Sequence, residues 1–263
     1  MYNDLLTIGP ITLHGYGLMI AIGIICALLM FEKRAKVRKL DSNTAYRLSL
    51  ISVLSGFIGA KLLYCIIEFK VIIDNPWKAI SGSGFVVYGG IISGILAAII
   101  YCKLKRVSFF SYFDLAVPSI ALAQGFGRIG CFLAGCCYGR ETNSTFGIVF
   151  GRSAIAPNGV KLIPTQLLSS AGDFMLAAIL LMYARKERKQ GRVGALYLIL
   201  YSIGRFVIEF FRNDDRGYMG VLSTSQFLSL IVLAFAILML YMSNKKIGTY
   251  FENKPLYKRR TFK

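Results

Sequence analysis

The chain has 263 residues, of which 56% are hydrophobic, and a formal net charge of +18. This hydrophobic content exceeds that of a soluble domain of similar length and indicates a single integral membrane domain over residues 1–263. The positive charge does not indicate a nucleic-acid-binding protein, because the lysines and arginines cluster in short connections between apolar runs and do not alternate with aromatic residues on one surface.

Seven apolar runs are long enough to cross a bilayer, which takes about 20 residues of helix. A helix satisfies its backbone hydrogen bonds within the segment, so all seven runs are predicted to be transmembrane helices. The predicted fold class is therefore an all-α polytopic membrane protein. The predicted spans are residues 11–30, 45–67, 84–102, 113–133, 167–184, 193–211 and 221–242.

The charges of the connections predict how the chain is oriented. Twenty of the 31 lysines and arginines lie after spans one, three and five and in the tail at about 244–263, whereas the opposite connections contain seven. The positive-inside rule then places the N-terminus outside and the basic tail in the cytoplasm. The longest connection, residues 136–166, is predicted to form a small extracytoplasmic loop region between spans four and five.

Charged residues lie inside spans where a plain membrane anchor would have none. Arg128 is in the fourth span, and a guanidinium in hydrocarbon costs about 2.5 kcal/mol or more. Arg205 and Glu209 are four residues apart in the sixth span and share a helical face, with Arg212 one turn further on. Two arginines and one carboxylate leave excess positive charge, which favours an anionic ligand, and a phospholipid phosphate is the obvious candidate.

The predicted topology puts these groups in the outer half of the membrane together with Tyr16, Tyr88 and Gln166, which outlines one polar cavity. Other interpretations stay open. Glu209 can be a purely structural ion-pair partner, and the two tyrosines can be interfacial aromatic residues. Gln226 can serve only for hydrogen bonding between helices.

The six cysteines, at positions 26, 65, 102, 131, 136 and 137, follow no zinc-ligand spacing, and the chain has one histidine. Neither a metal site nor a cofactor is therefore expected. The first three cysteines lie in or beside apolar runs, as small buried residues do. The adjacent Cys136 and Cys137 leave a reactive thiol possible, because neighbouring cysteines rarely bridge each other.

Several segments are similar to those of the bacterial phosphatidylglycerol–prolipoprotein diacylglyceryl transferases. The resemblance covers nearly the whole chain in the right order, and seven spans with the N-terminus outside is the topology of that family. The matching segments are Tyr16-Gly17-Leu18-Met19, Gly89-Gly90, Gly127-Arg128-Ile129-Gly130 with Gly135 and Gly139-Arg140, Pro164-Thr165-Gln166, Tyr201-Ser202-Ile203-Gly204-Arg205-Phe206, Glu209-Phe210-Phe211-Arg212 and Ser225-Gln226.

The resemblance implies an enzyme of the bacterial cytoplasmic membrane that passes the diacylglyceryl group of phosphatidylglycerol to the lipobox cysteine thiol of a prolipoprotein signal peptide. A thioether forms and glycerol 1-phosphate leaves. The implied partners are phosphatidylglycerol, the signal peptide and membrane lipids, with no nucleic acid and no cofactor or metal. Since the nucleophile belongs to the substrate, the enzyme needs no catalytic cysteine of its own.

The resemblance also implies roles for single residues. Arg128 and Arg205 would clamp the phosphate, because the guanidinium fork binds phosphate oxygens bidentately. Tyr16 would hydrogen-bond the headgroup or orient the thiol, and Tyr88 is the remaining catalytic candidate. The other candidates would shape the site and its substrate contacts: Arg140, Glu209, Arg212, Gly89, Gly90, Gly130, Gly139 and Gln166.

The chain departs from the family pattern at Tyr88, where many members have a histidine before the two glycines. Tyrosine is a poor base near neutral pH. Either the histidine is not essential to the chemistry, or a nearby arginine stabilises the deprotonated form of Tyr88 so that it can act as the base, or the chain is a paralogue. Cys131 also replaces a common asparagine, and Cys136-Cys137 replaces an acidic and apolar pair. A paralogue, and a lipid or anion transporter with the same arginine-lined cavity, stay open as alternatives.

Overall fold

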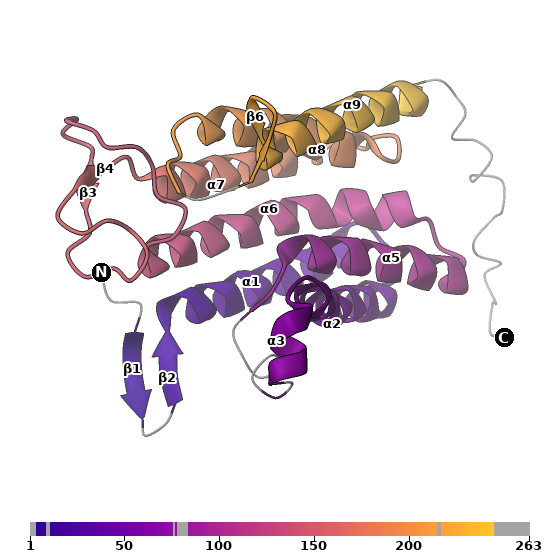
Figure 1. Cartoon of the computed structure of the whole chain (residues 1–263). Helices are drawn as coiled ribbons and strands as arrows, with labels where there is room; N and C mark the ends of the chain where they lie inside the picture. Colours follow the sequence, from indigo (N-terminus) through magenta and orange to yellow (C-terminus); the bar gives the residue numbers. More distant parts are fainter. Residues whose placement is uncertain (1–3, 9–10, 76, 78–83, 215–216, 245–263) are drawn as a thin grey trace, which may run out of the picture. The chain divides into compact units, whose positions relative to one another are not determined.

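The computed structural model describes residues 4–8, 11–75, 77, 84–214 and 217–244. Within these residues it contains seven long helices, a short helix and three antiparallel two-stranded sheets (Figure 1). All seven predicted helices are present. They are α1 (Gly15–Val37), α2 (Ser42–Ile67), α5 (Val87–Lys105), α6 (Phe109–Ala134), α7 (Thr165–Tyr183), α8 (Arg192–Glu209) and α9 (Thr224–Asn244), and the short helix is α3 (Phe69–Asp74).

Six of the long helices, all except α8, are long and apolar enough to cross a membrane. Large apolar side chains on them are exposed, such as Ile91, Ile92 and Leu96 on α5, as expected for a surface that contacts lipid. Helix α8 is more polar, because its 18 residues include Arg192, Arg205 and Glu209. The chain is a multi-pass membrane protein.

Two predicted spans begin too early, because apolar residues at their starts form strands. Residues Ile11–His14 form β2, which pairs with β1 (Asp4–Ile8), so α1 begins at Gly15. The strands β5 (Tyr218–Met219) and β6 (Leu222–Ser223) pair before α9 begins at Thr224. Hydrophobicity alone does not separate a short strand from the first turn of a helix.

A capping box sets the start of α9. The backbone N–H of Gln226 donates to Ser223 Oγ at 3.2 Å, and the backbone N–H of Ser223 donates to Gln226 Oε1 at 3.0 Å. These reciprocal bonds satisfy N–H groups that the first turn of a helix leaves unpaired. Gln226 therefore caps its own helix, and its interpretation as a bridge between helices was wrong.

The described residues between 31 and 112 form one compact unit, in which α2 packs closely against α5. The backbones approach through glycines: a Cβ atom at Gly89 would overlap the carbonyl oxygen of Gly59, and one at Gly90 would lie 3.0 Å from the carbonyl oxygen of Gly56. The Ser93 hydroxyl donates to the carbonyl oxygen of Ser55 at 2.8 Å. Small residues and such hydrogen bonds are typical of helix pairs in membranes.

The described residues of 1–30 and 113–244 form the second unit, in which α8 contacts both α7 and α9 (Figure 1). Its apolar core is built from α6, α7 and α8, with Val117, Leu180 and Tyr197 among the buried residues. A carboxylate joins two of these helices, because Asp114 of α6 accepts the backbone N–H groups of Gly191 and Gly194, each at 2.7 Å. The first N–H groups of α8 are thereby satisfied.

The connection between α6 and α7 folds into a small structure of its own. Strand β3 (Ile148–Val149) pairs with β4 (Lys161–Leu162), and Phe150, Ala156 and Leu162 form a small buried core. A compact loop region is therefore present where the sequence predicted it, and its extracytoplasmic location stays a prediction. The predicted basic tail beyond residue 244 lies outside the described residues, as do Lys78 and Arg216, two of the seven basic residues in the opposite connections.

We expect Gly89→Leu to destabilise the protein, because the new side chain would meet the backbone of Gly59, which can move only with α2. Overpacking of this kind costs about 1–3 kcal/mol, which corresponds to a thermal midpoint lower by roughly 2–10 °C. Thermal unfolding in detergent micelles measures the shift. Gly17→Leu is the control, since a Cβ atom at Gly17 has no neighbour within 4 Å in the part of the chain that the structure describes. Equal midpoints in the two variants would contradict the packing argument.

Candidate functional site

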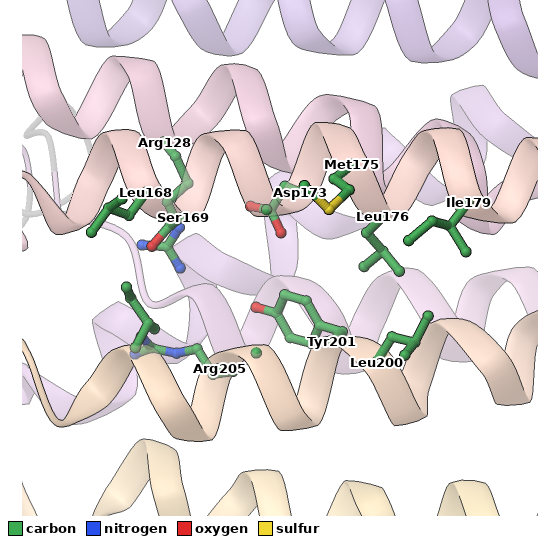
Figure 2. Close-up of a pocket in the computed structure, with 13 residues that line it drawn as sticks. Arg128, Leu168, Ser169, Asp173, Met175, Leu176, Ile179, Leu200, Tyr201 and Arg205 are labelled. Carbon is green, nitrogen blue, oxygen red and sulfur yellow. The ribbon is translucent and has the colours of Figure 1, made fainter.

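A pocket of ≈ 250 Å³ lies between α6, α7 and α8 (Figure 2). Arg128, Ser169 and Arg205 gather toward one end of it, and the apolar side chains of Ile179 and Leu200 lie at the other. The pocket thus offers hydrogen-bond donors at one end and hydrocarbon at the other. Its full lining is Arg128, Leu168, Ser169, Gly172, Asp173, Met175, Leu176, Ile179, Leu200, Tyr201, Gly204, Arg205 and Ile208.

The guanidinium of Arg128 reaches the pocket from α6. Within the described part of the chain, no group forms a hydrogen bond or an ion pair with it. Tyr201 and Asp173 are close enough to interact with it electrostatically. A partly buried arginine without a paired carboxylate is unusual, because desolvation of its charge is costly.

Arg205 reaches the pocket from α8 and is held by two groups. Its Nη1 lies 2.8 Å from Glu209 Oε2, and its Nη2 donates to Ser225 Oγ at 2.8 Å. Glu209 is only 2% exposed, and its Oε1 accepts a hydrogen bond from the Ser223 hydroxyl at 2.9 Å. The structural ion pair that the sequence left open for Glu209 is therefore present, and it fixes the orientation of Arg205.

Arg212 lies just after α8 and is bound on several sides by the protein. Its Nε and Nη2 donate to the two carboxylate oxygens of Asp214 at 2.9 and 2.6 Å, and its Nη1 lies 3.5 Å from Glu209 Oε2. Burial alone would lower the pKa of Arg212, but the hydrogen bonds to Asp214 raise it above its ordinary value. The guanidinium is therefore charged and already paired, and the sequence had not indicated Asp214.

Gly139 and Arg140 join the loop after α6 to the end of α8. The backbone N–H of Arg140 donates to the carbonyl oxygen of Phe211 at 2.8 Å, and that of Gly139 donates to the carbonyl oxygen of Ile163 at 3.1 Å. A Cβ atom at position 139 would lie 2.6 Å from the same Ile163 oxygen. Only glycine fits where these three backbone segments meet, and the substrate contacts predicted for both residues stay predictions.

Gln166, Gly130 and Tyr16 do not line the pocket. Gln166 is 1% exposed; its Nε2 donates to the carbonyl oxygen of Cys136 at 2.8 Å, while its Oε1 has no hydrogen-bond partner among the described residues. A Cβ atom at Gly130 would lie 3.2 Å from the Tyr16 ring. Tyr16 itself interacts electrostatically with Arg128.

The remaining predicted residues lie in the other unit. Tyr88, Gly89 and Gly90 are in α5, where the two glycines serve the packing against α2 and the Tyr88 side chain is half exposed. Their predicted contributions to catalysis and substrate binding stay predictions.

Asp173 is the pocket residue that the sequence reasoning missed. It is 8% exposed and is the one carboxylate in the fifth predicted span. The rule that singled out Arg128, that an ionisable residue inside a span marks a functional site, applies equally to it. Tyr201 appeared only within a matching segment, although its hydroxyl points into the pocket (Figure 2).

A group of metal-ligand type is present at the end of α6 and in the turn that follows it. The sulfur atoms of Cys131, Cys136 and Cys137 lie within 4.8 Å of one another. Hydrogen bonds from the Cys131 and Cys136 thiols lower the pKa of Cys137 against the effect of burial, and the charge of Arg212 lowers it further. Reading the cysteines by zinc-ligand spacing did not anticipate this arrangement.

Comparison with known proteins gives a consistent result. The model of the family described as prolipoprotein diacylglyceryl transferase matches residues 3–242. A relative from Clostridium tetani named phosphatidylglycerol--prolipoprotein diacylglyceryl transferase is 48% identical over 227 residues, which is 86% of this chain and 91% of that protein. One from Clostridium perfringens with the same name and the number 2 is 48% identical over 90% of this chain and 93% of its own length. A Finegoldia magna relative of that name is 34% identical over 88% of this chain and 92% of its own.

We expect Glu209→Gln to destabilise the protein strongly, because it leaves Arg205 and Arg212 facing a neutral amide in a buried site. Removing one partner of a buried ion pair costs about 3–5 kcal/mol. Unfolding by a denaturing detergent in mixed micelles measures the free energy of unfolding.

Glu32→Gln is the matched control for this variant. Glu32 also pairs with a cation four residues away in a helix, Lys36 at 2.7 Å, but both side chains are at least 36% exposed. A pair of this kind is worth less than about 1 kcal/mol. A similar small loss in both variants would show that Glu209 is not a structural counter-ion.

Proposed function

The chain belongs to the prolipoprotein diacylglyceryl transferase family, and from this premise we propose that it transfers the diacylglyceryl group of phosphatidylglycerol to the lipobox cysteine thiol of a prolipoprotein signal peptide. The thiol sulfur attacks the glyceryl carbon that carries the phosphate oxygen, and that carbon–oxygen bond breaks. A thioether forms, glycerol 1-phosphate leaves with the bonding electrons, and the thiol proton passes to a base. The names of the relatives specify the lipid and the class of acceptor.

The observation that carries the proposal is the guanidinium of Arg128, which lines a partly apolar pocket and has no hydrogen-bond or ion-pair partner among the described residues. A phosphate group would supply the missing anionic partner, and the planar fork of arginine suits two phosphate oxygens at once. Negative charge grows on the phosphate as the carbon–oxygen bond breaks. A fixed cation in a site of low dielectric constant stabilises that charge more than water does.

Arg205 supports the same anion from the opposite side of the pocket. Glu209 and Ser225 bind two of its nitrogen atoms, but the guanidinium carries five N–H donors, so donors remain for a phosphate oxygen. The two protein contacts hold the side chain in one rotamer. Arg205 therefore needs little reorganisation when the lipid binds, which is the condition for effective electrostatic catalysis.

The apolar end of the pocket fits the hydrocarbon part of the same substrate. Leu176, Ile179 and Leu200 line it, and the polar groups lie toward the other end (Figure 2). A ligand with a phosphate and an acyl chain satisfies both ends, whereas a small inorganic anion would leave the apolar end unfilled.

Asp173 is our candidate for the proton acceptor. Its carboxylate faces the pocket and forms no hydrogen bond or ion pair in the described ranges of the chain. When a phosphate binds beside it, repulsion between the two anions favours protonation of the carboxylate. The carboxylate therefore becomes a better proton acceptor at the stage when the thiol must lose its proton.

The topology proposed with this function is that of the sequence prediction. The N-terminus lies outside a bacterial cytoplasmic membrane, the C-terminus lies inside, and α8 is the sixth of the seven spans. The charge asymmetry of the connections supports this orientation. Helix α8 tolerates its two outer charges because Arg205 and Glu209 pair with each other. The relatives named above come from bacteria.

We expect Arg128→Ala to lower kcat/KM by about 10²–10³-fold, the usual cost of losing one donor to a developing anion. The kcat/KM of Arg128→Lys should lie between those of the wild type and Arg128→Ala, because lysine keeps the positive charge but lacks the two-pronged donor geometry of the guanidinium. The assay uses purified protein, phosphatidylglycerol vesicles and a lipobox peptide, with the diacylglyceryl adduct detected by mass. Arg152→Ala, in the exposed loop, is the control.

Full activity of Arg128→Ala would refute the phosphate clamp. A wild-type protein that binds phosphatidylglycerol but forms no adduct would instead favour the paralogue or the transporter over the transferase.

We expect Asp173→Asn to change the pH dependence of the reaction. Without an internal base the rate should follow the thiolate fraction of the peptide, whose thiol has a free pKa of about 8.5. The loss of kcat relative to wild type should therefore be greatest near pH 6.5 and shrink toward pH 9. Rate measurements over this range test the role. A loss of the same size at every pH would mean that Asp173 only balances charge in the pocket.

A further inference from the structure

The end of α6 brings two cysteine side chains together through its own backbone. The N–H of Cys136 donates to the carbonyl oxygen of Cys131 at 3.1 Å, and the N–H of Gly135 donates to that of Phe132 at 3.2 Å. Gly135 has a φ of +75°. This pair of bonds around a left-handed glycine is the Schellman motif, in which the side chains at the positions of Cys131 and Cys136 meet.

The third cysteine is fixed by contacts from the start of α7. Cys137 has a φ of +60°, in the left-handed region that residues with a side chain rarely adopt. Its carbonyl oxygen accepts a hydrogen bond from Thr165 Oγ1 at 2.7 Å, and that of Cys136 accepts one from Gln166 Nε2 at 2.8 Å. Both donors are 1% exposed. The three sulfur atoms are therefore held within 4.8 Å of one another by a rigid local structure.

We propose that Cys131, Cys136 and Cys137 bind a thiophilic metal ion of the zinc class through their three thiolates. Zinc–sulfur bonds are about 2.3 Å long, so the sulfur atoms of a tetrahedral site lie about 3.8 Å apart. The present separations exceed this by no more than about 1 Å, which side-chain rotation can close. A disulfide would use two of the three sulfur atoms, leave the third unused and require an oxidant.

The charges around the cluster fit a divalent ion. Three thiolates and a divalent cation carry a net charge of −1, and the positive charges of Arg128 and Arg212 both act on Cys137. Without nearby cations, an anionic complex of this kind would be costly in a partly buried site. The two arginines therefore stabilise the loaded site.

The cluster supplies three ligands and leaves the fourth position of a tetrahedral ion to an exchangeable ligand. Among the described residues no further histidine, cysteine, aspartate or glutamate completes the group. Zinc sites with three protein ligands keep that position for water or for another incoming ligand. An external thiol is a suitable ligand for a soft ion.

The test uses the full-length protein in detergent after reduction and removal of the reductant. Titration with Co²⁺, a coloured substitute for Zn²⁺, should produce thiolate-to-metal charge-transfer absorption, and elemental analysis after Zn²⁺ loading should find one ion per chain. Each of Cys131→Ser, Cys136→Ser and Cys137→Ser should weaken binding by more than about 100-fold, the upper cost of losing a mere supporting contact. Cys65→Ser is the control.

A second readout does not depend on the folding of variants. In wild type, Zn²⁺ should protect three of the six thiols from alkylation, and mass analysis should place the protected residues at 131, 136 and 137. Equal Co²⁺ absorption in Cys136→Ser, unchanged alkylation with Zn²⁺, or a disulfide within the cluster after purification under mild conditions would each overturn the proposal. Transferase activity enters none of these measurements, so they stand apart from the test of the proposed function.

Discussion

The structure depends on how it places guanidinium groups in an apolar environment. Arg205 and Arg212 share the buried carboxylate of Glu209, and Asp214 completes the pairing of Arg212. Such pairs largely cancel the cost of burial without providing net stability. Arg128 has no paired carboxylate in the described part of the chain. The positive charge of Arg128 is therefore not balanced by a paired anion among the described residues, and Arg128 lines the pocket.

The charge of Arg128 stays unbalanced because the packing of the helices restricts the positions that Arg128 and Asp173 can reach. Gly125 of α6 lies so close to α7 that a Cβ atom would meet the Phe174 ring at 2.5 Å, and Ser170 of α7 donates to the Gly125 carbonyl oxygen at 2.9 Å. These contacts fix α6 against α7 one turn from Arg128 and within one turn of Asp173. Because the backbone is held in place here, the side chains of Arg128 and Asp173 cannot easily move to pair with another group of the protein.

The sequence predicted the parts of this site whose signals are local. An arginine in an apolar run indicates a functional site by its position alone. The spacing of Arg205 and Glu209 predicts their pairing on one helical face. The sequence did not predict Asp214 as the partner of Arg212, because that contact depends on a turn after α8. The sequence predicts helix where β2 and β6 form, because apolar residues favour both helices and strands and only backbone pairing decides between them. Asp173 was overlooked although the rule used for Arg128 covers it.

The cysteine cluster shows why spacing rules fail when a helix end intervenes. Residues five and six apart on a continuous helix point in different directions, but a left-handed Gly135 and a left-handed Cys137 fold the chain back on itself. The same turn anchors Thr165 and Gln166, the first residues of α7, which carries Asp173 two turns later. An ion bound to the three sulfur atoms would therefore stiffen the element that positions the pocket carboxylate. The turn that holds Cys136 and Cys137 and the helix that faces the substrate are joined through two hydrogen bonds from the buried side chains of Thr165 and Gln166.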